Sequence, residues 1–440
     1  MTDIDPEKLA LLLLAFASFF LVGASLSKTT NQKLILLLLL SGFFLYSGIA
    51  TADVNTPPFL LFCYVVFSAC VIFGFAVGLT VFSSLGRAVE KYASPQISAI
   101  SQGPVSQYFI AFFICLNISA LLFPDFRLHL LISPPAPDMR LWFSGQLSID
   151  RSVDFSLVHY ITTLFTPFYY VALFGLRRKP LRLISVLALI DYLRYVDQSY
   201  IGRSEIFFDT TFVFIVLWTE HRSFRWLLTL GAVAVAPIAA TGFYAYSMLR
   251  LGVSLENIDL TGAAYRVIES EFTFLIRAGM PLIDSAQHAD LGRYLAWILT
   301  LPIPGFLKGG IDVARVNYDM STIVLGRGVS DPNFYVLLPG LLAESIYLFG
   351  DTFFFLHAIV IGMVAAFFCR LCERVPNMTT LFTYVAILFF YNLNRGGIAS
   401  LLPSVVNEFL AFYLFLGVSI YRTKGSIWRA LPSQYPGKEA

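Results

Sequence analysis

Residues 9–26 read LALLLLAFASFFLVGASL, an apolar run without a charged side chain. A helix that crosses the hydrocarbon core of a bilayer needs about 20 predominantly apolar residues, so this run is predicted to be a membrane helix. The segment before it is acidic (Asp3, Asp5, Glu7), unlike the basic start of a signal peptide, and no small-residue cleavage site follows. We therefore expect the run to be kept as the first membrane span.

The composition of the whole chain agrees with a lipid environment. Of the 440 residues, 57% are hydrophobic and only 13% are charged, and the mean hydropathy is +0.73. A soluble domain is normally about 25% charged. The net charge of +2 gives no indication of a nucleic-acid partner. Zinc-ligand, phosphate-loop and hydrolase motifs are missing from the sequence, so no metal and no cofactor are expected.

Similar apolar stretches recur along the chain and predict about eleven membrane spans. They are residues 9–26, 34–50, 59–82, 107–123, 157–176, 183–199, 201–219, 226–246, 352–369, 380–394 and 401–421. The stretches lack strand-like alternation, and helices satisfy every backbone hydrogen bond inside lipid. The expected fold is one all-α, polytopic membrane domain over residues 1–440.

The distribution of Lys and Arg predicts the orientation of the spans. One set of connecting segments carries 16 of these residues, whereas the opposite short segments carry three, Lys8, Arg203 and Arg395. Cytoplasmic loops are enriched in Lys and Arg. The N-terminus is therefore predicted to face out, and the C-terminus is predicted to face the cytoplasm.

This orientation holds only if the apolar stretch 334–350 does not cross the membrane. A full crossing there would move Arg370 and Arg374 to the outer side. The Pro-Gly pair at 339–340 and the charge of Glu344 also make the stretch a poor lipid-facing span. We expect a re-entrant or interface-lying helix, with a twelfth span as the alternative.

Two outward segments, residues 124–154 and 247–333, are longer than connections between helices need to be. The second contains helix-like stretches at 263–280 and 290–300. Long loops with structure of their own are usually functional, so this loop is expected to contribute to a site on the outer side.

Arg203 lies at the start of the span 201–219, in the sequence Gly-Arg-Ser-Glu. A helix that begins just after it reaches about 24 Å at 1.5 Å per residue, which is less than the roughly 30 Å of the hydrocarbon core. Arg203 is therefore expected at or within the outer membrane boundary. A snorkelling side chain at the interface is the alternative.

The preceding span carries Asp191, Arg194 and Asp197, spaced three apart and therefore on one helical face. Ionisable side chains at such depth normally face the interior of the helix bundle or a wet cavity. The pattern predicts either a substrate contact through Arg194 or a structural ion-pair cluster around it.

A third charged feature is Arg395, in the Asn-Arg-Gly-Gly turn predicted between the last two spans. Paired glycines let the backbone approach a ligand closely, although a plain turn is the alternative. The long outer loop adds six further arginines: Arg250, Arg266, Arg277, Arg293, Arg315 and Arg327. Arg266 and Arg277 would share a face if 263–280 were one helix, and a solvated surface helix is the alternative.

Arg203, Arg395 and some of the loop arginines are predicted at one level, the outer surface of the bilayer. Guanidinium groups bind phosphate oxygens through paired, charge-assisted hydrogen bonds. A phosphate receptor at that depth suits a phosphate anchored in the membrane, so the substrate class indicated is a lipid diphosphate.

At the same residues the chain resembles the Wzy-type oligosaccharide repeat-unit polymerases, and among them the enterobacterial common antigen polymerases. The resemblance rests on three short segments in the C-terminal half: residues 202–206, residues 302–350 with the following span, and residues 394–397. It implies a membrane-embedded C-type glycosyltransferase of the bacterial inner membrane, active in O-antigen or lipopolysaccharide biosynthesis.

Such an enzyme would transfer a growing glycan from undecaprenyl diphosphate to the sugar end of another lipid-linked unit, at the periplasmic face. The resemblance implies no nucleotide sugar and no metal. The expected partners are the undecaprenyl-diphosphate-linked oligosaccharide, membrane lipids and a polysaccharide chain-length regulator. Related O-antigen ligases have a histidine near the segment 330–333, which here reads Ser-Asp-Pro-Asn, and this difference favours a polymerase.

The chemistry of such a transfer assigns roles to the charged residues. Arg203 and Arg395 are predicted to stabilise the charge on the departing diphosphate. The residues predicted as further substrate contacts are Arg266, Arg277, Arg315 and Arg194. Asp331 and Glu344 are the candidate acceptors of the proton from the attacking hydroxyl. Either acid alternatively caps a helix or pairs with an arginine.

Three other functions remain open from the sequence. An O-antigen ligase would use the same chemistry with a different acceptor. A transporter or flippase would show internal repeats and broken helices, and no corresponding halves are recognisable in the sequence. A lipid-phosphate sugar transferase would need an acidic residue in the first outward loop, where Asp53 stands alone.

Overall fold

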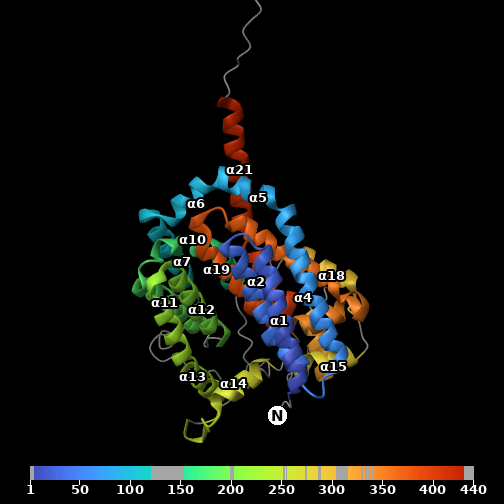
Figure 1. Cartoon of the computed structure of the whole chain (residues 1–440). Coiled ribbons are helices and arrows are strands. Elements are labelled where there is room, and N and C mark those ends of the chain that lie inside the picture. The colour runs from blue at the N-terminus through green and yellow to red at the C-terminus, as the bar shows by residue number, and fades with distance from the viewer. Residues whose placement is uncertain are drawn as a thin grey trace, which may run out of the picture.

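The computed structural model describes residues 4–119, 153–198, 203–250, 253, 255–272, 275–285, 289–303, 316–328, 331, 334, 336–338 and 340–430. Over these ranges the regular structure is helical apart from an isolated bridge between Ile4 and Asp53. The predicted all-α fold is therefore confirmed for this part of the chain. Its helices bundle side by side, with α21 projecting from one end (Figure 1).

The N-terminal half begins with helices α1 (Pro6–Leu26), α2 (Thr30–Phe43), α4 (Pro58–Val81), α5 (Ser83–Ala88), α6 (Ser94–Ser101) and α7 (Gly103–Ser119). It continues with α10 (Val153–Leu173), α11 (Pro180–Gln198), α12 (Arg203–Glu220) and α13 (Arg225–Arg250). Side chains that accept hydrogen bonds from free backbone N–H groups start the first two helices. Asp5 caps α1 and Thr29 caps α2.

The C-terminal half contains α14 (Ala263–Phe272), α15 (Met280–Asp284), α16 (Leu291–Thr300), α17 (Val316–Leu325), α18 (Leu341–Cys372), α19 (Thr379–Leu388), α20 (Asn394–Pro403) and α21 (Leu410–Ala430). Short π-helical segments continue several helices, among them η1 (Phe44–Gly48), η7 (Leu275–Gly279), η10 (Phe389–Leu393) and η11 (Ser404–Glu408). The helix predicted at 290–300 is α16, which Asp290 caps. The stretch predicted as a helix at 263–280 is described in two parts, α14 up to Phe272 and the π-helical segment from Leu275, and residues 273–274 between them lie outside the described set, so its continuity stays a prediction.

Six helical stretches of the described residues are long and apolar enough to cross a membrane. They are Pro6–Leu26, Thr30–Thr51, Pro58–Val81, Arg222–Ala245, Leu341–Cys372 and Pro376–Glu408. A seventh would be the pair Ser83–Ser101 and Gly103–Ser119, which is bent by 72°. A helical membrane protein is thus supported, whereas the eleven predicted spans are not confirmed. Within the described residues, Tyr160–Leu176 and Leu410–Thr423 are apolar helices that are shorter than a full span.

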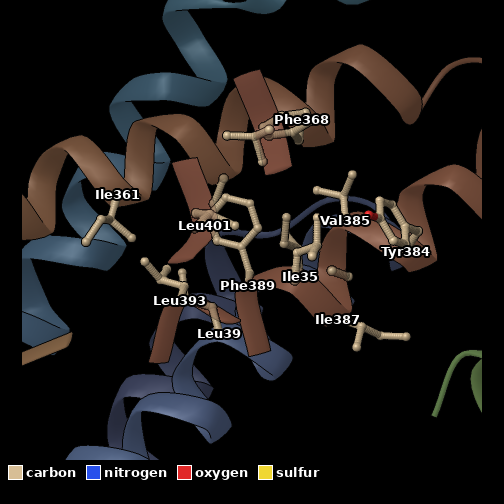
Figure 2. Close-up of a cluster of buried hydrophobic side chains, with 14 of the residues drawn as sticks. Ile35, Leu39, Ile361, Phe368, Tyr384, Val385, Ile387, Phe389, Leu393 and Leu401 are labelled. Carbon is tan, nitrogen blue, oxygen red and sulfur yellow. The ribbon is translucent and has the colours of Figure 1, made fainter. Parts of the chain in front are cut away.

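The core lies where α19 and η10 pack between α2 and α18 (Figure 2). Ile35 and Leu39 of α2, Phe368 of α18, and Phe389 and Leu393 of η10 are at most 2% exposed. Helices in lipid approach closely where glycines face a neighbour. The α4–α18 contact uses this device, because a Cβ added to Gly74 or Gly362 would overlap a backbone carbonyl of the other helix.

Helix α18 reverses direction at Gly350, whose φ of 73° is non-helical. Ser345 before the break and His357 after it are joined by a hydrogen bond of 2.7 Å between Oγ and Nδ1. In a straight helix these residues would lie about 18 Å apart. The arm 341–349 is therefore short, about 14 Å at 1.5 Å per residue, and it is buried against neighbouring helices. This geometry fits the prediction that the stretch ending at residue 350 does not cross.

A second reversal occurs at Gly397, where φ is 67° inside α20. Tyr384, in α19, donates a hydrogen bond to Glu408, at the end of η11, although a continuous helix would separate them by about 36 Å. The Asn-Arg-Gly-Gly segment is thus the tip of a hairpin. The turn predicted there is present, and it is built into helix rather than into a loop.

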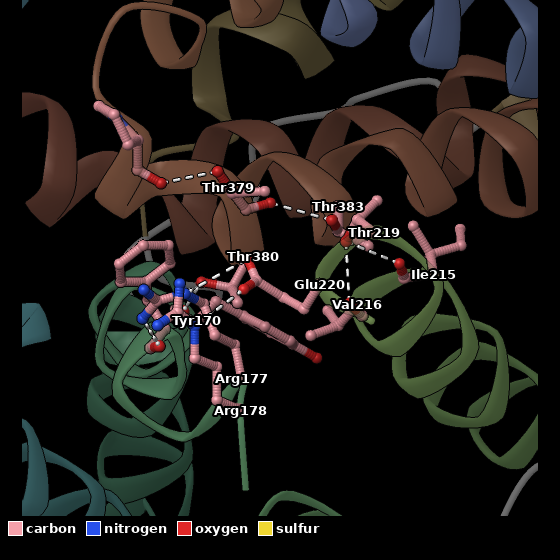
Figure 3. A network of polar contacts seen from close by, with 12 residues as sticks. Tyr170, Arg177, Arg178, Ile215, Val216, Thr219, Glu220, Thr379, Thr380 and Thr383 are labelled. Carbon is pink, nitrogen blue, oxygen red and sulfur yellow. Dashed lines mark hydrogen bonds and ion pairs between the residues drawn. The ribbon is translucent and has the colours of Figure 1, made fainter. Parts of the chain in front are cut away.

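The connecting segments predicted to be cytoplasmic come together at one end of the structure. Glu220 pairs with Arg177 at 3.3 Å and with Arg178 at 3.5 Å, beside the Thr380 hydroxyl, which donates to the Tyr170 carbonyl (Figure 3). At the same end, near α5 and α6, the guanidinium of Arg374 contacts Glu90 at 2.9 Å. The N-terminus, α14 and α15 lie at the opposite end (Figure 1).

Candidate functional site

Two helix breaks meet at Glu344, a carboxyl group that is 1% exposed. Its oxygens accept hydrogen bonds from the backbone N–H groups of Ile398, at 2.5 Å, and Ala399, at 3.1 Å. These two groups open the helical arm that follows Gly397 and have no carbonyl partner in the preceding turn. Glu344 therefore caps the broken end of α20. The structure favours the helix cap, one of the alternatives left open for this residue, over the proton acceptor.

Gly397 is required by this arrangement in two ways. Its positive φ is unfavourable for residues that carry a Cβ. In addition, a Cβ at this position would overlap the carboxyl oxygens of Glu344. The Glu344 side chain thus fills the space that a larger residue at 397 would occupy, and the two residues together fix the tip of the hairpin.

Arg395, two residues before Gly397, contacts an acidic side chain and a tyrosine hydroxyl. Its Nε lies 3.3 Å from Oε2 of Glu271, and its Nη1 donates to the hydroxyl of Tyr391 at 2.7 Å. The side chains of Arg395 and Glu271 are only 19% and 17% exposed. Because Glu271 belongs to α14 of the long outer loop, this ion pair joins that loop to the last helical hairpin.

Aromatic rings surround the pair. Tyr46 of η1 makes edge contacts with Phe272 at 5.1 Å and with Tyr391 at 6.1 Å between ring centroids. Phe207 of α12 lies 5.5 Å from Tyr391 on another side. An apolar wall of this kind lowers the local dielectric and strengthens the interaction of the guanidinium with any anion.

Arg203 is the first residue of α12, and its side chain lies outside the described set. Its backbone is one helical turn, about 6 Å, from Phe207. Since Phe207 contacts Tyr391, the start of α12 lies near the level of the Tyr391–Arg395 turn. Arg203 and Arg395, which are predicted to share a site, are thus each four residues away from one of these two contacting rings.

Arg194 lies in a buried polar cluster between α11, α12 and η11. Asp191 lies close to the carboxyl group of Asp209, and Arg194 interacts electrostatically with Asp191 and with Glu408. Asp209 is 8% exposed. These interactions agree with the structural cluster left open for Asp191 and Arg194 and add acids from two other helices, whereas the side chain of Asp197 lies outside the described residues.

The remaining predicted residues are distributed along the outer loop. Arg266 is 43% exposed and binds Asp259 at 2.8 Å and the hydroxyl of Tyr244 at 2.7 Å. The backbone N–H of Thr261, its hydroxyl and the Arg266 guanidinium lower the pKa of Asp259. Arg266 therefore braces α14 against α13 through the hydroxyl of Tyr244.

Two further predicted residues, Arg315 and Arg277, fall partly or wholly outside the described part of the chain, whereas Asp331 lies within it. Arg315 is not described, and for Arg277 only the backbone is described, in η7. Asp331 is described at a bend, where its backbone N–H donates to the carbonyl of Gly328 at 2.9 Å and its carbonyl accepts from Phe334. Asp331 is thus placed in a tight turn.

Sequence reasoning missed Glu271, Tyr391 and Glu408. Glu408 carried a usable indication, because it is the lone acid within the predicted span 401–421, and ionisable residues in such a span are normally functional or paired. Glu271 had none, since its partner is remote in the chain. Comparison of the chain with protein-family models, with curated proteins and with solved structures found no match.

Proposed function

We propose that this chain is a membrane-embedded glycosyltransferase that polymerises lipid-linked oligosaccharide repeat units at the periplasmic face of the bacterial inner membrane. The growing glycan passes from undecaprenyl diphosphate to the sugar of another lipid-linked unit. Arg395 and Arg203 hold the departing diphosphate, and the chain uses no metal for this step.

One observation carries the proposal. A guanidinium that is shielded from water and walled by aromatic rings lies at the end of the bundle opposite to the Arg177–Glu220 pair. Preorganised cations in a water-poor site stabilise the charge of a leaving group more strongly than exposed cations do. A lipid-borne diphosphate is the anion whose position in the bilayer suits such a receptor.

The test compares two ion-paired arginines of nearly equal geometry. Arg395→Ala is expected to slow polymerisation by about 100-fold or more, so that a gel of the lipid-linked glycans shows one repeat unit instead of a ladder. Arg177→Ala removes a guanidinium that is 23% exposed and paired at 3.3 Å at the other end, and it is expected to keep the ladder. A normal ladder from Arg395→Ala would contradict the proposal.

The shape of the charged group provides a second comparison. Arg395→Lys is expected to restore little activity, because an ammonium group lacks the planar fork that binds two phosphate oxygens at once. Full activity of the lysine variant would argue for a role in packing or simple charge balance.

A transporter or flippase is the second candidate, and the two helix reversals at Gly350 and Gly397 favour it. Broken helices that meet inside the membrane are typical of secondary transporters. Reconstituted vesicles separate the candidates, because a polymerase lengthens the glycan, whereas a flippase moves labelled lipid-linked units across the bilayer without lengthening them.

A further inference from the structure

The ion pair between Glu271 and Arg395 has a consequence for how an anion reaches the site, and this inference rests on the proposed function. We propose that the Glu271 carboxylate occupies the position on Arg395 that a phosphate would take, and so acts as an internal stand-in for phosphate. The lipid diphosphate then binds Arg395 only by displacing Glu271 and releasing α14. Helix α14 is then the part of the outer loop that responds to substrate.

The donor groups of Arg395 explain why displacement is needed. Nη1 already donates to Tyr391, and Glu271 occupies the edge of the guanidinium at Nε. Bidentate binding of a phosphate uses two parallel N–H groups on one edge of the fork. The Nε edge is open to such binding only after the Glu271 carboxylate has left.

The low exposure of both partners makes this an exchange of one anion for another. A guanidinium that is largely shielded is strongly destabilised when it loses its counter-charge. The charge of Arg395 is therefore balanced by the Glu271 carboxylate before the lipid binds and by the diphosphate after it has bound. A diphosphate carries more negative charge than a single carboxylate, which favours the exchange.

The anchors of α14 indicate which part of the loop moves. Near one end of the helix, Arg266 holds Asp259 and Tyr244 in an exposed contact. At the other end, Glu271 holds Arg395, and Phe272 contacts Tyr46. Loss of the Glu271 contact leaves the second end with its contact between Phe272 and Tyr46, while the first end still ties α14 to α13, so the helix is expected to swing rather than to detach.

The experiment uses the full chain in lipid nanodiscs with undecaprenyl diphosphate as the probe. Glu271→Gln is expected to bind this lipid about tenfold more tightly than the unmodified chain, because the competing charge is removed. Glu220→Gln removes a carboxyl group of similar exposure from the matching pair with Arg177 and is expected to leave the dissociation constant unchanged. Hydrogen exchange of residues 263–272 should increase when the probe is added to the unmodified chain.

A double variant that exchanges the two charges tests whether loss of binding is caused by misfolding. The double variant Glu271→Arg with Arg395→Glu keeps an ion pair, so it is expected to fold with an unchanged melting temperature and to lose binding of the probe. Tight binding by the exchanged pair would overturn the inference.

The outcomes separate this inference from the proposed function. Equal binding of the probe by the unmodified chain and by Glu271→Gln would overturn only the role of Glu271. If neither the unmodified chain nor Glu271→Gln binds the probe while both are folded, the lipid-diphosphate site is overturned, and with it the proposed role of Glu271.

Discussion

At the scale of single residues, the site depends on groups whose roles follow from their neighbours. Glu344 is an acid in an apolar stretch, which on sequence alone suits a proton acceptor or a cap equally well. Its acceptance of two backbone N–H groups assigns it to the cap. The partner lies 54 residues away from Glu344 in the chain, and for that reason spacing and periodicity gave no indication of it.

Gly397 provides the sharpest test at this scale. Gly397→Ala is expected to lower the melting temperature strongly, because both the positive φ and the overlap with Glu344 are unfavourable. Gly326→Ala is the matched control, since Gly326 has a φ of 64° but nothing within 4 Å of an added Cβ. The backbone term alone costs about 1–2 kcal/mol, so equal losses in the two variants would show that the Glu344 contact contributes nothing.

At the scale of helices, hydropathy located several elements well because lipid-facing helices are apolar over their whole length. The predicted span 9–26 lies within α1 (Pro6–Leu26), and 59–82 corresponds to α4 (Pro58–Val81). The prediction did less well where a helix is held by specific contacts. The contacts of the last residues described in α14 were not foreseeable, because Glu271 and Phe272 pack against residues of η1 and α20 that are remote in sequence.

The contact between α4 and α18 is expected to be the most sensitive helix interface to added volume. Gly362→Ala places a methyl group on the carbonyl oxygen of Val71, and inserting one carbon into a tight contact typically costs about 1–3 kcal/mol. Gly417→Ala, at a helical glycine with nothing within 4 Å, is expected to change the melting temperature little. Thermal unfolding in one detergent compares the two variants. Equal melting temperatures would mean that α4 and α18 accommodate the added methyl group without a loss of stability.

At the scale of the whole molecule, ionic contacts at the two ends have different compositions. The end near α5 and α6 gathers Arg177, Arg370 and Arg374 with carboxylates from neighbouring segments. The opposite end holds Arg395 and Lys8, whose ammonium group donates to the carbonyls of Asp53 and Thr56. The positive-inside rule associates short basic connecting segments with the cytoplasmic face, and the predicted orientation rests on this rule.

This orientation predicts the labelling of single cysteines introduced into a chain whose five native cysteines have been replaced. Asp259→Cys is expected to react with a membrane-impermeant maleimide on intact spheroplasts. Arg178→Cys, which replaces a side chain that is 75% exposed at the other end, is expected to react only after the membrane is opened. The reverse pattern would invert the topology and remove the periplasmic site.

Under the proposed function, the capped break at Gly397 also restricts how the molecule would select among anions. The first N–H groups of a helix that starts inside a membrane protein ordinarily can bind an anionic ligand. Here the groups of Ile398 and Ala399 are already saturated from within the fold. Discrimination between phosphate species therefore falls to side-chain cations, which mutation can retune one at a time without unravelling the helix.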